Sequence, residues 1–207
     1  MKLISTLFNF VRLTAKSYKI DESHGISHSM DVFLKSNEIY NHEVIKSPFL
    51  VNQKRIIYTA AILHDTCDRK YMDKKDGIIL LTEFLKDKFS LSDIDIIIKI
   101  ISTMSYSYVK KYGFPDLKEY QLAYHIVREA DLLAAYDINR SIIYDMEQNE
   151  SELPTALLNS ENLFKKRMFK HFDDDLFITE YSRNIAKIFE IESYYKLSQW
   201  KDIINSF

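Results

Sequence analysis

Only three glycines and three prolines interrupt this chain of 207 residues. Short strands joined by tight turns depend on these two residue types, so their scarcity argues against an all-β sandwich. It also argues against a collagenous or a disordered chain, because 46% of the residues are apolar. The length is ample for one domain with a hydrophobic core. The composition therefore favours a helical chain.

Apolar residues recur at helical spacing through most of the chain. Two faces show the pattern clearly, with Ile57, Ala60, Ala61 and His64 on one, and Tyr124, Val127, Asp131 and Ala134 on the other. Ser92-Asp93 would cap a further helix that runs through Ile101, and Asp173 to Asp175 would begin one that reaches Phe189. The sequence thus predicts a single all-α domain over 1–207, with its core at about 21–190.

The first residues resemble a secretory leader only superficially. Ser5, Thr6 and Asn9 break the apolar run, and no small-residue cleavage site follows before Lys16. Residues 2–18 predict an amphipathic helix packed on the core, with a peripheral membrane anchor as the alternative. Nothing approaches the roughly 20 apolar residues of a membrane span. We expect a soluble, cytoplasmic protein without a membrane partner.

Charge and cysteine content exclude further classes. Lys and Arg total 28 against 30 Asp and Glu, so no global basic field recruits double-stranded nucleic acid. A lone cysteine excludes an internal disulfide and a thiolate metal cage, as is typical of a reducing compartment. The sequence leaves homo-oligomer formation open.

Ionisable side chains stand at several positions where the helical pattern expects apolar ones. They are His24 and His28, His64-Asp65, Asp68, and Asp131. Burying such a group costs several kcal/mol unless it is paired or bound to a metal. Taken singly, each is more often a helix cap or a surface group; together they call for a common explanation.

The order His28, His64-Asp65, Asp131 resembles the H…HD…D signature of the HD-domain metal-dependent phosphohydrolases. Longer segments are similar to one branch, the small pyrophosphohydrolase-like proteins that act on nucleotides. Residues 21–28 resemble its "sHDxxH" opening, 60–70 its "AALLHDxxDxK", 128–135 its "DADrLdA" and 179–186 its "TexgRxlA". The resemblance implies a compact helical HD-domain bundle with additional C-terminal helices.

By this resemblance, His28, His64, Asp65 and Asp131 would hold one divalent metal ion. Two imidazoles with two carboxylates suit manganese, iron, cobalt or nickel, and tolerate magnesium or zinc. We favour manganese. An octahedral shell with four protein ligands leaves two positions for a water and a substrate oxygen.

Other residues of the motifs would act on the water and the phosphate. Asp68 is one helical turn past Asp65, so we predict it as the general base, with a surface carboxylate paired with Arg69 or Lys70 as the alternative. His24, Lys70 and Arg140 are predicted to bind the substrate.

Two positions depart from the motifs of this branch, and residues after one of them are candidates for a substrate pocket. Ser105, Tyr106 and Tyr108 could line a nucleoside pocket, although aromatic residues near a helix end more often belong to the core or its rim. Met104 stands where an "HSFS" segment of the branch has histidine, and Asp31 where an arginine is expected. Both departures lie outside the predicted metal ligands.

We expect metal-dependent hydrolysis of a nucleotide, with release of pyrophosphate from a nucleoside triphosphate as the leading reaction. The alternatives are a nucleotide phosphomonoesterase, an alarmone hydrolase, and a catalytically weak or inactive nucleotide-sensing or interaction module. Gly25, Gly77 and Gly113 are too scattered for a phosphate-binding loop, so a metal and basic side chains would have to hold the phosphates.

Overall fold

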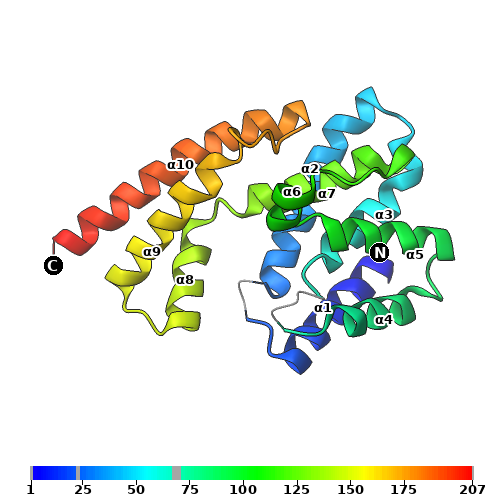
Figure 1. Cartoon of the computed structure of the whole chain (residues 1–207), viewed down its shortest axis with the longest axis horizontal. Helices are drawn as coiled ribbons and strands as arrows, with labels where there is room; N and C mark the ends of the chain where they lie inside the picture. The colour runs from blue at the N-terminus through cyan, green and yellow to red at the C-terminus, as the bar shows by residue number, and fades with distance from the viewer. Residues whose placement is uncertain (1, 22–23, 67–70, 207) are drawn as a thin grey trace. The chain divides into compact units, whose positions relative to one another are not determined.

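The computed structural model describes residues 2–21, 24–66 and 71–206, and within these ranges it contains ten α-helices, two short 3-10 helices and no strand (Figure 1). The predicted all-α fold is confirmed. The chain divides into two compact units, Met1–Asp131 and Leu132–Phe207, which are described separately. The prediction of a single domain over 1–207 stays a prediction.

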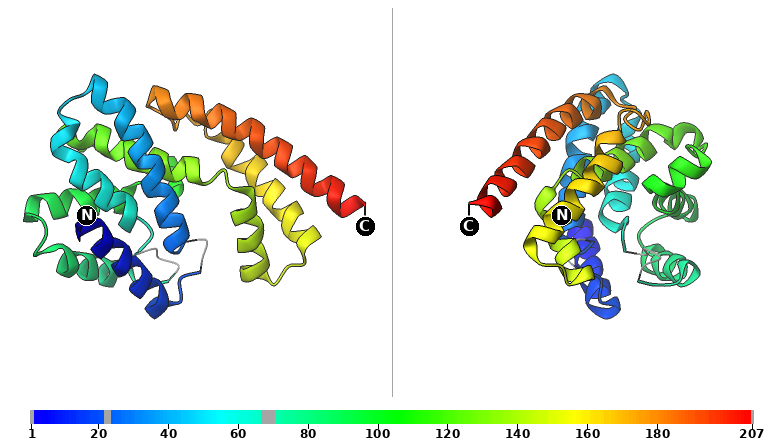
Figure 2. Two further views of the ribbon diagram at one scale, coloured as in Figure 1. Left: turned by 180° about the vertical axis from the view of Figure 1, so that it is seen from behind. Right: turned by 60° about the vertical axis from the view of Figure 1, so that its left-hand side comes forward.

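The first unit is built around α3. Its helices are α1 (Lys2–Tyr18), α2 (Ile26–Lys46), α3 (Leu50–Leu63), α4 (Lys74–Leu85), α5 (Leu91–Thr103), α6 (Tyr106–Tyr112), the 3-10 helix η1 (Lys118–Tyr120) and α7 (Gln121–Ala134) as far as Asp131. Helix α3 packs against α1, α2 and α5, and Figures 1 and 2 show α2 and α3 side by side. Its buried face includes Ile57, Ala60 and Ala61, the residues whose spacing predicted a helix.

Helix α1 matches the predicted amphipathic segment 2–18. Leu7 and Val11 are buried on its inner face, where α1 contacts α2 and α3. Burial of two apolar residues one turn apart is what an amphipathic helix achieves by packing on a core.

The second unit consists of α8 (Ile138–Asn149), α9 (Leu153–Lys166), the 3-10 helix η2 (Met168–Lys170) and α10 (Glu180–Asn205). Helices α8 and α9 form an antiparallel pair, and α10 contacts both (Figure 2). Tyr136 links η2 to α10 within this unit. Its hydroxyl donates to Met168 O at 3.0 Å, and its carbonyl accepts from Ser193 Oγ at 3.2 Å. Within the described ranges, no helix has the length and apolar character needed to cross a membrane.

Two predicted helix starts are wrong. Helix α5 is capped by Ser90 rather than by Ser92-Asp93, because the Ser90 hydroxyl accepts from Asp93 N and the helix begins at Leu91. Helix α10 begins at Glu180, not at Asp173. Asp175 has φ of 50°, a left-handed conformation that cannot continue an α-helix, and the Thr179 hydroxyl then caps α10.

Candidate metal centre

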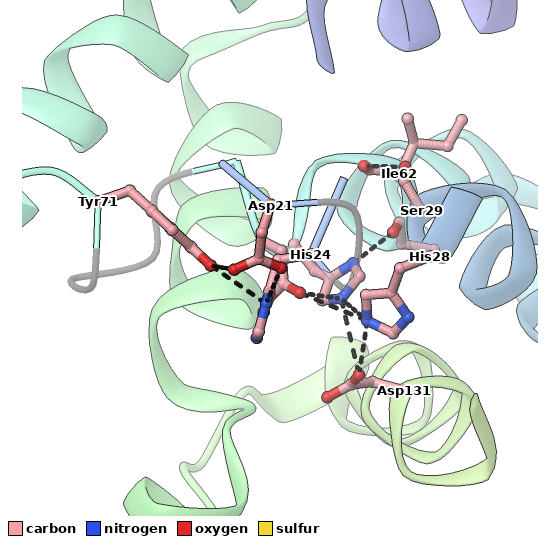
Figure 3. A network of polar contacts seen from close by, with 10 residues as sticks. Asp21, His24, His28, Ser29, Ile62, Tyr71 and Asp131 are labelled. Carbon is pink, nitrogen blue, oxygen red and sulfur yellow. Dashed lines mark hydrogen bonds and ion pairs between the residues drawn. The ribbon is translucent and has the colours of Figure 1, made fainter. Parts of the chain in front are cut away.

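The start of α2 places His28. The helix begins at Ile26, directly after Gly25, so His28 lies in its first turn and is 4% exposed. The neighbouring Ser29 hydroxyl donates to Ile62 O at 2.6 Å, which joins the first turn of α2 to the last turn of α3 (Figure 3). The imidazole of His28 is thereby held beside the end of α3.

His64 and Asp65 follow directly on the last residue of α3. Thr66 N donates to Leu63 O at 3.0 Å, so the chain turns at this point. His64 Nδ1 lies 2.8 Å from Ala61 O. Because a carbonyl only accepts, we assign a proton to Nδ1, so Nε2 is the nitrogen that faces the site. A metal-ligating histidine is commonly held in this orientation by a hydrogen bond from its other ring nitrogen.

Four side chains from α2, the α3 terminus and α7 converge at this point. His28 Nε2 lies 3.1 Å from His64 Nε2, 3.4 Å from Asp65 Oδ2 and 3.3 Å from Asp131 Oδ1. His64 Nε2 lies 3.3 Å from Asp65 Oδ2 and 3.6 Å from Asp131 Oδ1. The imidazoles are buried, whereas the carboxylates of Asp65 and Asp131 retain 21% and 26% exposure.

The distances among His28, His64 and Asp65 fit one ion. Ligand atoms about 2.0–2.2 Å from a metal lie about 3 Å apart at right angles and about 3.5 Å apart at tetrahedral angles. The ligand atoms of His28, His64 and Asp65 all lie within 4.8 Å of one another, and the group could hold a metal ion. Asp131 lies beside this group, because its Oδ1 is close to Nε2 of both imidazoles. The carboxylates of Asp65 and Asp131 are partly exposed, so solvent reaches the group on their side.

The pKa values of His64, Asp65 and Asp131 indicate a site that attracts positive charge. Burial lowers the pKa of His64, but the carboxylates of Asp65 and Asp131 outweigh it and raise this pKa to about 9. Burial raises the pKa of Asp65, but the two imidazoles outweigh it and hold the value well below its usual range. The pKa of Asp131 is lowered for the same reason. The carboxylates thus stay ionised and attract positive charge between the imidazoles.

The remaining predicted site residues have different positions. His24 is next to the cluster, with its ring centroid 6.5 Å from that of His28. Arg140 lies on α8 in the second unit, where its backbone N–H donates to the capping residue Asp137. Asp68 and Lys70 lie outside the described residues. The catalytic role of Asp68 and the substrate contacts of His24, Lys70 and Arg140 stay predictions.

A polar network beside His28 was not predicted. The Tyr71 hydroxyl donates to Asp21 Oδ2, and His24 Nδ1 lies 3.3 Å from both Asp21 Oδ1 and the Tyr71 hydroxyl (Figure 3). The network connects the segment before α2 with the segment before α4. Asp21 belongs to the segment 21–28 that was compared with the "sHDxxH" motif, but nothing in the sequence pattern points to Tyr71.

A cavity of about 680 Å³ opens from the centre, and His64, Asp65 and Asp131 form part of its wall. Ser105 and Tyr108 line it, and so does Met104. That this cavity holds a nucleoside stays a prediction. Tyr106 is not among its described lining residues. The volume lies within the usual range for small-molecule sites.

Helix α7 carries a second buried polar cluster, one turn before Asp131. Arg128 Nη2 donates to Glu129 Oε1 at 3.2 Å, and the two side chains are 1% and 0% exposed. Burial lowers the pKa of Arg128, an effect that Glu129 opposes. His125 lies 3.4 Å from Arg128 Nη2, and burial together with this cation lowers the pKa of His125 to about 3.

The buried His125 is expected to make folding acid-sensitive. Its pKa is about 3 in the folded chain, against an ordinary value of 6.5, so the unfolded chain binds the extra proton between these pH values. Stability therefore falls as pH falls through this window. By pH 5 the loss contributed by His125 is on the order of 2 kcal/mol. The raised pKa of His64 acts in the opposite direction, so the contribution is measured by comparing urea unfolding at pH 7 and pH 5 between the unchanged chain and a variant that lacks His125.

The control is His125→Gln, which cannot gain that proton. Its free energy of unfolding should change less between pH 7 and pH 5 than that of the unchanged chain. Equal changes in the two proteins would contradict the assignment of acid sensitivity to His125.

A comparison with protein-family models, curated proteins and solved structures finds no match to this chain. What the site can do therefore follows from its own residues and geometry.

Proposed function

We propose that this chain is a metal-dependent phosphohydrolase of the HD-domain type that hydrolyses a nucleotide. The observation that carries the proposal is the group of His28, His64 and Asp65, whose ligand atoms lie close enough together to hold a metal ion, with Asp131 Oδ1 3.3 Å from His28 Nε2 and 3.6 Å from His64 Nε2. The four residues occur in the order of the H…HD…D signature, and a cavity of organic-ligand size adjoins them.

A divalent ion in this donor set, manganese in the favoured case, would lower the pKa of a water molecule and polarise a phosphoryl oxygen. The chain supplies the positioning. Ala61 O orients the ring of His64, and the Ser29 to Ile62 bond holds the first turn of α2, which carries His28. Burial of both imidazoles keeps competing water from their nitrogens.

The carboxylates supply negative charge and an open side. Asp65 and Asp131 would balance the charge of the ion, and their partial exposure leaves an approach for the phosphate from the cavity. Asp68 stays the predicted base that takes the proton from the attacking water. The leading reaction is cleavage of a phosphoanhydride bond in a nucleoside triphosphate, giving the monophosphate and pyrophosphate.

The test is hydrolysis by protein stripped with a chelator, dialysed, and supplied with Mn²⁺ and a panel of nucleoside triphosphates and monophosphates. Release of phosphate or pyrophosphate should require added metal, stop on addition of chelator and resume with excess Mn²⁺. A reaction with Mn²⁺ and no protein gives the background. Metal binding without release above that background would contradict the hydrolase proposal.

A further inference from the structure

One face of α6 lines the cavity beside the metal centre. Tyr108, Lys111 and Tyr112 occupy positions i, i+3 and i+4 of this helix, so they project on the same side, and all three belong to the cavity wall. The ring centroids of Tyr108 and Tyr112 are 4.9 Å apart, and Lys111 Nζ lies 4.9 Å from the centroid of Tyr112. Helix α6 therefore presents two aromatic rings and one ammonium group to a ligand in the cavity.

Another part of the cavity wall is apolar. Aliphatic side chains of α4 and α5 form it, namely Ile78, Leu81, Ile98 and Ile101. Of the three serines in the described part of the wall, Ser102 donates to Lys99 O, Ser105 caps α6 by accepting from Tyr108 N, and Ser107 Oγ lies 3.4 Å from Ser105 Oγ. Each of these hydroxyls therefore has a contact within its own segment. Such a surface buries an apolar or aromatic group well and satisfies a row of sugar hydroxyls poorly.

The charges of the cavity have one sign outside the metal centre. Among its described lining residues, Lys74 and Lys111 are the charged side chains beyond the centre, and Asp65 and Asp131 are the only acids. No asparagine or glutamine is among the lining residues that the structure describes. The cavity thus suits an anion with a flat aromatic body, and it lacks the amides that read the edges of particular bases.

We propose that α6 selects the substrate: Tyr108, with Tyr112 beside it, stacks on the aromatic base of a nucleotide, and Lys111 binds a phosphate oxygen. This inference rests on the proposed function for the position of the reacting phosphate at the metal centre. Every base has a π face, so recognition by stacking separates nucleotides from other organic phosphates but separates one base from another only weakly.

The test is equilibrium binding by calorimetry in the presence of chelator, so that neither metal nor turnover enters the measurement. The probes are adenosine 5′-monophosphate, uridine 5′-monophosphate, ribose 5-phosphate and hexyl phosphate. The two nucleotides should bind with Kd values within about tenfold of each other, and ribose 5-phosphate should bind at least about tenfold more weakly than either. Hexyl phosphate should bind more weakly than the nucleotides.

Variants of α6 separate the two contacts. Tyr108→Leu should weaken nucleotide binding by about tenfold and leave ribose 5-phosphate unchanged, whereas Tyr108→Phe, which keeps the ring, should bind nucleotides normally. Lys111→Gln should weaken nucleotides and ribose 5-phosphate by the same factor. Lys110→Gln is the matched control, because Lys110 precedes Lys111 on the helix and lies outside the described lining of the cavity. Circular dichroism checks that each variant is folded.

Three results would overturn the inference: ribose 5-phosphate binding as tightly as the nucleotides, Tyr108→Leu weakening both alike, or hexyl phosphate binding more tightly than the nucleotides. Failure of the proposed function looks different. Nucleotide binding that depends on Tyr108, in a protein without metal-dependent hydrolysis, would support the role of α6 and remove the hydrolase.

Discussion

Asp65→Asn is expected to lower the affinity of the protein for Mn²⁺ by at least about a hundredfold. Replacing a residue that only hydrogen-bonds to a metal ligand already lowers metal affinity by about 10–100-fold, and Asp65 is itself a proposed ligand. The amide has the size of the carboxylate but lacks its negative charge, and charge is what Asp65 brings to two buried imidazoles. Nucleotide hydrolysis at limiting Mn²⁺ should fall in parallel. Calorimetric titration with Mn²⁺ and an assay of phosphate release measure the two effects.

Asp95→Asn is the matched control. Asp95 lies on α5 in the same unit, is 59% exposed, and pairs with Lys99 at 2.7 Å, so its loss should leave metal binding unchanged. Unchanged Mn²⁺ affinity in Asp65→Asn would show that the cluster is not the metal centre. Circular dichroism should confirm that the variant folds, because Asp65 also stabilises the cluster when metal is absent.

Glu129→Leu is expected to cost about 3–5 kcal/mol of unfolding free energy, which is typical when one partner of a buried ion pair is removed. The guanidinium of Arg128 is 1% exposed and would lose the carboxylate that lies 3.2 Å from it. Transfer of a guanidinium from water to such a place is expensive without a counter-charge. Urea unfolding followed by circular dichroism gives the free energy, with the two units fitted as separate transitions where the curve requires it.

Two further variants show whether the effect belongs to the ion pair. Glu119→Leu removes an exposed carboxylate from η1 and should change stability by no more than about 0.5 kcal/mol. Arg128→Met combined with Glu129→Leu should recover part of the stability that Glu129→Leu loses, because no buried charge then remains. A double variant no more stable than Glu129→Leu would contradict this account.

The meeting of His28, His64, Asp65 and Asp131 was predicted from the resemblance of their order to the H…HD…D signature, and each also stands where the helical pattern expects an apolar residue, which is visible in a sequence. The predicted helix over 2–18 matches α1 for a similar reason, since its apolar face has a regular period. A polar residue at a core position and a row of apolar residues at helical spacing can both be seen within a short stretch of sequence. Both indicate which side chains must be buried.

What escaped prediction depends on contacts between distant segments or on single backbone angles. The Tyr71 hydroxyl contacts Asp21 although the two residues are 50 positions apart in the sequence. No regular spacing of residue types in the sequence indicates this contact. The start of α10 depends on the left-handed φ of Asp175, whereas three consecutive acids are typical of a helix start. Tyr108 was recognised as a possible pocket residue, but its alignment with Lys111 toward the same cavity required the structure.

The bond between Ser29 and Ile62 has a consequence for the order of folding. Helices α2 and α3 are consecutive and joined by a short turn, so bringing their ends together closes only a modest loop and costs little chain entropy. His28 and His64 belong to this helical hairpin and meet when it forms. Asp131 comes from α7, far along the chain, and joins only after a much longer closure. We expect the imidazole pair to form early and the complete set of ligands to form only when α7 docks.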